Sequence, residues 1–210
     1  MPKTAAFENH SDAYDEWFEI NADHYAAELA TVRKLLPEDP QKGLEVGVGS
    51  GKFAGPLGIK TGVEPCKEMA EKARKLGIEV LPGIAEQLPF DDESVPFILS
   101  VTTICFVDDV LKTFQESFRV LQPGGSILVG FVDKESELGK KYQANKDKSR
   151  FYQEATFYST QELIDSLTAA GFNNLHCKQS LIPDVPQGTI RDGHGEGAFV
   201  VIKGYKPKGP

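Results

Sequence analysis

Apolar side chains recur at helical spacing in four stretches of the chain. In the first, about residues 11–36, they fall every three or four positions, and Pro37 and Pro40 follow. This spacing places the apolar side chains on one face of a helix, and proline ends such a segment. The pattern therefore predicts one or two helices over 11–36, and further helices over 66–76, 110–121 and 159–170.

Short apolar runs lie between these segments and have the lengths of strands. The first ends near residue 46, and the others cover 59–63, 79–81, 97–103, 126–132, 175–180 and 198–205. The run at 97–103 is apolar almost throughout, which is typical of a central strand buried on both faces. Because strands and helices alternate along the chain, the pattern predicts an open α/β sheet.

Composition narrows the class of protein. The 210 residues suffice for one α/β domain, and the net charge of −8 disfavours a nucleic-acid partner. Cys66, Cys105 and Cys177 form neither a C-x-x-C pair nor a metal-binding spacing, so we expect reduced thiols and no metal. No apolar run is long enough to span a bilayer. We therefore expect a cytoplasmic protein without a membrane or nucleic-acid partner, of unspecified oligomeric state.

A glycine-rich turn directly follows the first strand. Gly47, Gly49 and Gly51 alternate with other residues, and the lack of Cβ atoms lets backbone approach a ligand closely. The phosphate-binding P-loop pattern fails, because Val46 replaces its first glycine and Phe53 its hydroxyl residue. The dinucleotide pattern G-x-G-x-x-G/A does fit residues 49–54. Dinucleotide-binding proteins also have an acid about 20 residues further on, and Glu64, which ends the next strand, comes too early. An NAD-dependent oxidoreductase is therefore kept as the alternative and not as the first interpretation.

The turn, together with Glu45 before it, resembles motif I of the class I methyltransferases that use S-adenosylmethionine (SAM). Two later segments resemble the ubiquinone/menaquinone-type subfamily: G-I-A-E-Q-L-P-F at 83–90 and R-V-L-Q-P-G-G at 119–125. The chain departs from the pattern at Ile84, where the family has an acid that contacts adenine. The resemblance then leaves adenine to the Ala85 amide, to apolar packing and to Glu86.

The resemblance implies a Rossmann-like class I methyltransferase fold. Its sheet would have seven mostly parallel strands, with helices on both faces and the last strand antiparallel. Residues 1–210 would form a single domain: a helical lid (1–40), a SAM-binding core (41–132), an insertion near the acceptor (133–158), and a final helix with strands (159–210). The implied reaction transfers a methyl group from SAM to a small-molecule acceptor by in-line displacement. A SAM-binding module without catalysis stays as a further alternative.

The same resemblance and the topology of open sheets suggest a set of site residues, with no particular catalytic residue among them. Glu64 ends the second strand, where a carboxylate can accept hydrogen bonds from both ribose hydroxyls. The expected cofactor-binding residues are Tyr14, Glu45, Gly47, Gly49, Gly51, Glu64, Pro65, Met69, Gly83, Ala85, Glu86, Thr102 and Thr103. The expected acceptor pocket, between the lead-in helix and the insertion, comprises Tyr14, Trp17, Phe18, Thr103, Cys105, Phe106, Tyr152 and His194. His194 and nearby Glu196 suit either acid–base work or a polar surface loop.

Overall fold

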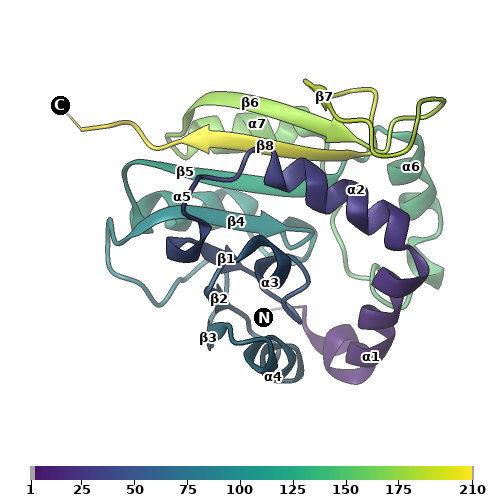
Figure 1. The fold of residues 1–210 in the computed structure, drawn as a ribbon, viewed down its shortest axis with the longest axis horizontal. Helices are drawn as coiled ribbons and strands as arrows, with labels where there is room; N and C mark the ends of the chain where they lie inside the picture. The colour runs from purple at the N-terminus through teal and green to yellow at the C-terminus, as the bar shows by residue number, and fades with distance from the viewer. Residues whose placement is uncertain (1–2, 210) are drawn as a thin grey trace.

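The computed structural model describes residues 3–209 and shows a mixed α/β architecture (Figure 1). The helices are α1 (Ala5–Ile20), α2 (Ala22–Arg33), α3 (Ala54–Leu57), α4 (Lys67–Lys75), α5 (Val110–Val120), α6 (Glu137–Ala144) and α7 (Thr160–Ala169). The strands are β1 (Leu44–Val46), β2 (Thr61–Val63), β3 (Glu79–Leu81), β4 (Val95–Val101), β5 (Leu121–Val132), β6 (Asn173–Ser180), β7 (Arg191–Asp192) and β8 (Phe199–Tyr205). In these described residues, no helix is long and apolar enough to cross a membrane.

The strands form one sheet in the order β3-β2-β1-β4-β5-β8-β6-β7. Pairing is parallel from β3 to β5, and β8 runs antiparallel to both β5 and β6. The predicted Rossmann-like fold and its antiparallel last strand are thus confirmed. The predicted number of seven strands is wrong by one, because Arg191 and Asp192 pair with β6 as a short edge strand. Both residues are exposed and polar, so no apolar pattern marks them.

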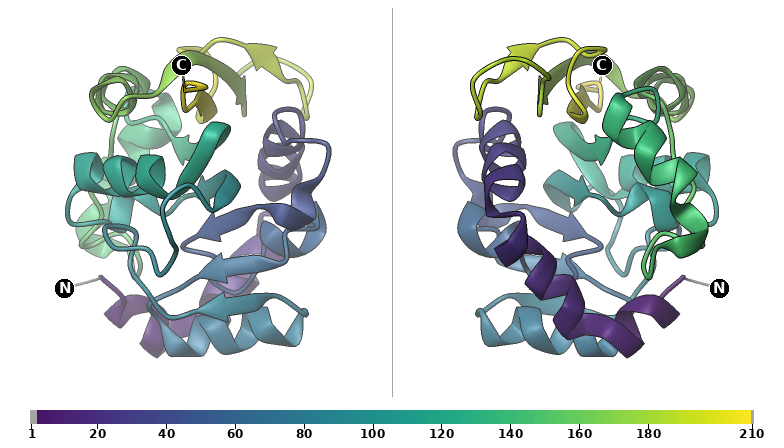
Figure 2. Two further views of the ribbon diagram at one scale, coloured as in Figure 1. Left: turned by 90° about the vertical axis from the view of Figure 1, so that its left-hand side faces the viewer. Right: turned by 90° about the vertical axis from the view of Figure 1, so that its right-hand side faces the viewer.

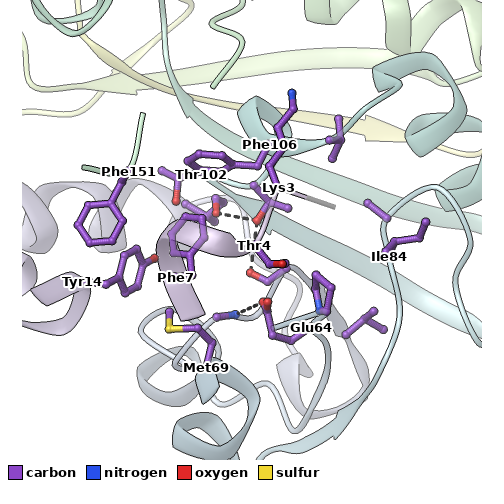
Figure 3. Close-up of a pocket in the computed structure, with 18 of the residues that line it drawn as sticks. Lys3, Thr4, Phe7, Tyr14, Glu64, Met69, Ile84, Thr102, Phe106 and Phe151 are labelled. Atoms are coloured by element: carbon purple, nitrogen blue, oxygen red, sulfur yellow. Dashed lines mark hydrogen bonds between the residues drawn. The ribbon is translucent and has the colours of Figure 1, made fainter. Parts of the chain in front are cut away.

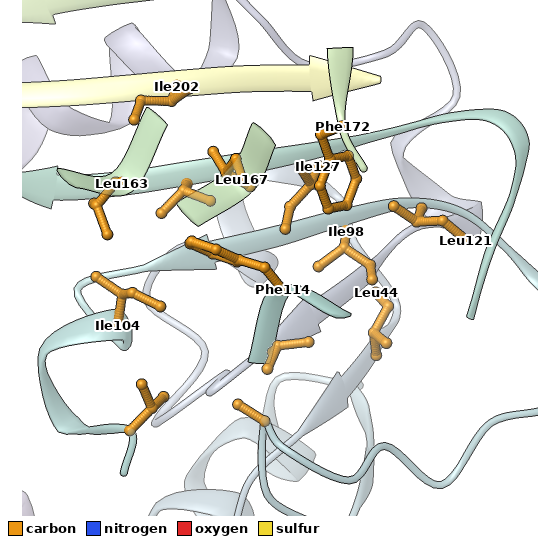
Figure 4. Packing of buried hydrophobic residues seen from close by; sticks show 14 of the residues in the cluster. Leu44, Ile98, Ile104, Phe114, Leu121, Ile127, Leu163, Leu167, Phe172 and Ile202 are labelled. Atoms are coloured by element: carbon orange, nitrogen blue, oxygen red, sulfur yellow. The ribbon is translucent and has the colours of Figure 1, made fainter. Parts of the chain in front are cut away.

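Helices cover both faces of this sheet, as the side views show (Figure 2). Consecutive residues of the central strands point to opposite faces, so that Ile98 packs with α5 and α7 whereas Leu99 packs with α2, α3 and α4. Figure 4 shows the first of these two clusters, centred on Phe114. The fully buried alternation explains why β4 has an almost continuous apolar sequence.

The lead-in segment begins earlier than the sequence pattern predicts. Helix α1 starts at Ala5 rather than near residue 11, and its backbone leaves helical geometry at His10. Residues 8–12 are all polar, so few apolar positions mark the first turns of this helix. Seen from the carboxyl ends of the parallel strands, α1 and α6 lie across them (right panel of Figure 2).

The segment after β5 is closed at its base by one buried carboxylate. Asp133 accepts hydrogen bonds from the Thr160 hydroxyl (2.6 Å) and backbone amide (3.1 Å) at the start of α7. Next to it, the Lys134 amide donates to the Tyr158 carbonyl oxygen (3.0 Å). A capping box formed by Ser159 and Glu162 starts α7. The two ends of the segment are therefore held together, and its middle extends over the strand ends.

Candidate functional site

A large cavity opens at the carboxyl ends of the parallel strands, where open α/β sheets bind ligands (Figure 3). It encloses about 1300 Å³ when the space at its mouth is included. The residues after β1, β2, β3 and β4 form its floor, and α1, α2, α6 and the loop after α6 form its walls. The cavity thus lies between the strand ends, where a nucleotide-type ligand would sit, and the helices that cover them.

The glycine turn after β1 forms one side of the floor. Gly47 has a φ of +71°, and a Cβ there would meet the Thr103 side chain at 2.3 Å, so only glycine fits. A Cβ on Gly49 would instead enter the cavity, 3.5 Å from the Met69 methyl carbon and 3.9 Å from the Tyr14 hydroxyl oxygen. Backbone is therefore exposed to a ligand at Gly49, as the sequence predicts for a close approach.

Glu64 lies opposite Tyr14 across the floor (Figure 3). Its two carboxylate oxygens accept hydrogen bonds from the backbone amides of Gly49 (2.8 Å) and Cys66 (2.9 Å). Burial raises the pKa of this carboxyl, and the two amides oppose the rise. Glu64 thus joins the glycine turn to the start of α4, so it supports the local fold as well as facing the cavity.

The segment after β3 forms the opposite side of the floor. Gly83, Ile84, Ala85 and Glu86 all line the cavity. One Glu86 oxygen accepts hydrogen bonds from two backbone amides just before α5, those of Asp108 (2.7 Å) and Asp109 (3.2 Å). The carboxylate expected near a cofactor ring therefore also ties this segment to the next helix.

The end of β4 is strained where it meets the cavity. Thr102 has a φ of +52°, which a β-branched residue rarely adopts, and its amide donates to the Gly130 carbonyl oxygen (2.8 Å). Thr103 turns back, and its hydroxyl donates to the Val101 carbonyl oxygen (3.1 Å). Strain of this kind concentrates at functional sites.

Two residues expected to bind the cofactor do not line the cavity. Glu45 is buried beneath the turn, where the Ala54 backbone amide bonds to it and burial raises its pKa. Gly51 faces α4 and the residues that follow it, and a Cβ there would stand 2.8 Å from the Ile78 side chain. The alternating glycine spacing predicts a turn, but only two of its three glycines face the ligand side.

Helix α1 is held over the cavity by Asp15. The Ser50 hydroxyl (2.6 Å) and the Lys72 ammonium (2.8 Å) donate to its two oxygens. Burial alone would raise the pKa of Asp15, but these hydrogen bonds lower it below its ordinary value. Lys72 also bonds Asp12 (2.6 Å), so α1 is fastened to the glycine turn and to α4.

Most of the expected acceptor pocket does come together. Trp17, Phe18, Phe106 and Tyr152 line the cavity with Tyr14 and Thr103. Cys105 lies instead in a small neighbouring cavity; its thiol donates to the Thr102 carbonyl oxygen (3.2 Å), and burial raises its pKa to about 12. His194 is exposed on the loop after β7 and does not line the cavity. That loop continues from the far edge of the sheet, which accounts for the discrepancy.

Several lining residues were not predicted from the sequence. Phe7 lies against Phe106 with ring centroids 5.0 Å apart, and it also contacts Tyr14 and Phe151. Its spacing of seven from Tyr14 would have been a signal for an earlier helix start. The other unpredicted residues of the cavity are Lys3, Thr4, Glu28, Phe53, Val63, Ile84, Val101, Val107, Asp108, Val132, Tyr142 and Phe151.

Comparison with known proteins establishes the family. The sequence model of a family described as a methyltransferase domain matches residues 44–129. A solved Thermotoga maritima protein, described as a SAM-dependent methyltransferase and possible histamine N-methyltransferase, is 48% identical, with a TM-score of 0.92. That match covers 97% of this chain and 99% of the other. The chain belongs to the SAM-dependent methyltransferases.

Other relatives of this methyltransferase extend the picture. An uncharacterised Methanocaldococcus jannaschii protein is 40% identical over 203 residues, which are 95% of this chain and 98% of that protein. A demethylmenaquinone methyltransferase of Staphylococcus aureus is 24% identical over 205 residues, covering 82% and 85% of the two chains. These findings confirm the predicted enzyme class and SAM as its cofactor. They give no support to an NAD-dependent oxidoreductase or to a non-catalytic SAM-binding module.

The cavity of the methyltransferase fits SAM. Gly49 leaves backbone open on the floor, and the Glu64 oxygens each retain a lone pair beyond the amide they accept. Met69 is fully buried beneath the turn and offers an apolar surface beside them. Hydroxyl groups and an apolar ring would both find complementary partners here.

Proposed function

We propose that this enzyme transfers the methyl group of SAM to a small-molecule acceptor held against aromatic side chains. The observation that carries the proposal is the division of one cavity into two chemically different parts. The floor near Gly49 and Glu64 presents backbone and a carboxylate, whereas the wall formed by Phe7, Phe106 and Tyr152 is aromatic. The two ligands of a methyl transfer differ in the same way.

On the floor, we assign Glu64 to the two ribose hydroxyls, because a charged acceptor makes strong and directional hydrogen bonds with a diol. The Ala85 amide and the apolar side chains of Ile84 and Met69 would hold the adenine ring. Gly47, Gly49 and Pro65 would shape the contact surface, and Thr102 and Thr103 would lie near the reacting end. These assignments agree with the positions of the residues around the cavity.

On the wall, the aromatic rings position the acceptor. SAM supplies a methyl carbon made electrophilic by a sulfonium centre. Ring faces attract positive charge, so Tyr14, Phe106 and Tyr152 favour a cationic group between them. Holding the nucleophilic atom about 3 Å from the methyl carbon supplies much of the rate available to such a reaction. The segment from Asp133 to Tyr158 would thus act on the acceptor side, with the α1 lid opposite.

The relatives name different acceptors, since histamine appears in one description and demethylmenaquinone in another. Neither name passes to this chain by similarity alone. We also place the enzyme in the cytoplasm, because Cys66, Cys105 and Cys177 are all free thiols, as expected in a reducing compartment.

Titration calorimetry with SAM, S-adenosylhomocysteine and NADH tests the cofactor part of this function. We expect heat with the first two and none with NADH; NADH binding without SAM binding would refute the proposal. Incubation with SAM and a metabolite mixture then tests transfer. The expected product is a compound heavier by one methylene unit, and cofactor binding without any such product would refute transfer to a small molecule.

A further inference from the structure

Glu28 is a buried acid that faces the same cavity. It lies in the middle of α2 with 4% of its surface exposed, and it is among the cavity-lining residues. Within residues 3–209 its carboxyl group takes part in no hydrogen bond or ion pair. A carboxyl group without a partner in an apolar wall costs stability, so its presence calls for a ligand that completes it.

The groups around Glu28 are phenols rather than cations. Burial raises the pKa of four tyrosine hydroxyls, and the charge of Glu28 raises it further. They belong to Tyr14 of α1, Tyr25 of α2, Tyr142 of α6 and Tyr152 of the following loop. Lys3 lines the cavity, and its charge influences the pKa of Cys105 and Asp108 rather than that of Glu28. Lys52 forms an ion pair with Asp15 at 3.5 Å. On β8, which packs against α2, Lys203 donates to the Leu35 carbonyl oxygen (2.6 Å). No cation in the described part of the chain therefore neutralises Glu28.

The surroundings also set the protonation of this group. Burial, with no opposing contact, raises the pKa of the Glu28 carboxyl to about 8. A base with a pKa near the working pH both accepts and returns protons readily. A protonated amine beside Glu28 would favour its ionised form and so find a counter-charge there, with aromatic rings around it, whereas an anionic acceptor would disfavour that form.

We propose that Glu28 recognises a protonated amine on the acceptor and takes its proton before methyl transfer. This inference rests on the proposed methyl transfer and names its substrate class. The proton passes from the ammonium nitrogen to a Glu28 carboxylate oxygen, which frees the nitrogen lone pair. That lone pair forms the bond to the methyl carbon while the carbon–sulfur bond breaks and leaves its electron pair on sulfur. The products are the N-methylated amine in its protonated form, S-adenosylhomocysteine and a neutral Glu28.

Matched ligand pairs test the recognition step. Hexylamine, 2-phenylethylamine and tryptamine are each compared with the alcohol of the same skeleton, by calorimetry on enzyme saturated with S-adenosylhomocysteine. We expect at least one amine to bind ten times more tightly than its alcohol. In Glu28→Gln this preference should vanish, with alcohol binding unchanged. Asp23→Asn, an exposed substitution on the same helix, should keep the preference.

Turnover of the amine that binds best tests the proton transfer. Glu28→Gln should lower kcat at least 100-fold, as expected for loss of a general base, whereas Glu28→Asp should restore part of it. Equal binding of amine and alcohol, retention of the preference in Glu28→Gln, or no binding by any amine would overturn the inference. In each of those cases binding of S-adenosylhomocysteine would leave the proposed function standing, whereas its loss in the unmodified enzyme would refute both.

Discussion

Replacing Glu28 by glutamine should stabilise the protein, and the gain should grow with pH. Glutamine has the shape of a protonated glutamate, so the two proteins differ mainly in ionisation. The folded pKa of about 8 lies above the ordinary 4.5, so the folded state holds this proton over a range in which the unfolded chain has lost it. The native carboxyl therefore contributes a stability that is complete below pH 4.5 and is lost as pH rises toward 8.

The size of the effect follows from this difference of pKa. Each unit corresponds to about 1.4 kcal/mol, so Glu28→Gln should be more stable by about 1 kcal/mol at pH 5, about 3 kcal/mol at pH 7 and about 4–5 kcal/mol at pH 8.5. In a chain of this length, about 3 kcal/mol corresponds to a rise of roughly 6–12 °C in Tm.

Thermal unfolding followed by circular dichroism at these three pH values, without ligand, measures the trend. Asp23→Asn is the matched control, because Asp23 is an exposed acid on the same helix. Its Tm should differ from that of the unmodified protein by an amount that does not vary with pH. A constant difference for Glu28→Gln as well would refute the reasoning, since it would mean that the carboxyl titrates normally and is solvated or paired.

Three further substitutions probe the floor, the lid and the wall of the cavity. Glu64→Ala should weaken SAM binding about 10- to 150-fold and also lower Tm, because the carboxylate accepts hydrogen bonds from two backbone amides. Calorimetry measures the affinity and thermal unfolding the Tm; an unchanged affinity would show that the residue is purely structural. Asp15→Asn should release S-adenosylhomocysteine about 5- to 30-fold faster, measured by stopped flow, and an unchanged rate would show that its contacts with Ser50 and Lys72 do not hold the lid. Trp17→Ala should lower turnover while the far-ultraviolet spectrum stays unchanged; normal turnover would remove Trp17 from the acceptor wall.

Most of the fold could be predicted because apolar periodicity records burial. Ile98 and Leu99 face different helix layers, and a strand buried on both faces can only be apolar. The edge strand at Arg191 could not be found in this way, since it owes its existence to pairing with β6 and buries no side chain. The predicted start of α1 is too late for a different reason: residues 8–12 are all polar, so Phe7 stands apart from the apolar repeat on which the prediction depends.

Site residues could be predicted where strand order alone places them, and less well where helix packing decides which way they face. Gly47 and Glu64 lie at strand ends that topology brings together, so their positions followed from order along the chain. Gly51 has the same spacing, yet the packing of α4 decides which way it faces. Glu28 is a charged residue on a helix, which usually means a solvated face. Its position three residues after Tyr25 and four before Val32, within the apolar stripe, was the available signal.

The position of β8 between β5 and β6 has a consequence for the order in which the molecule can fold. Residues 199–202 are fully buried in the sheet, and they follow β5 by more than sixty positions along the chain. Until they are in place, β5 presents an open apolar edge, and β6 with β7 has no strand through which to join the sheet. Such long-range pairing slows folding and leaves an intermediate able to pair with other chains. Refolding should therefore become less efficient as protein concentration rises, and a peptide copying 199–205 would compete for that edge only while β8 is still unpaired.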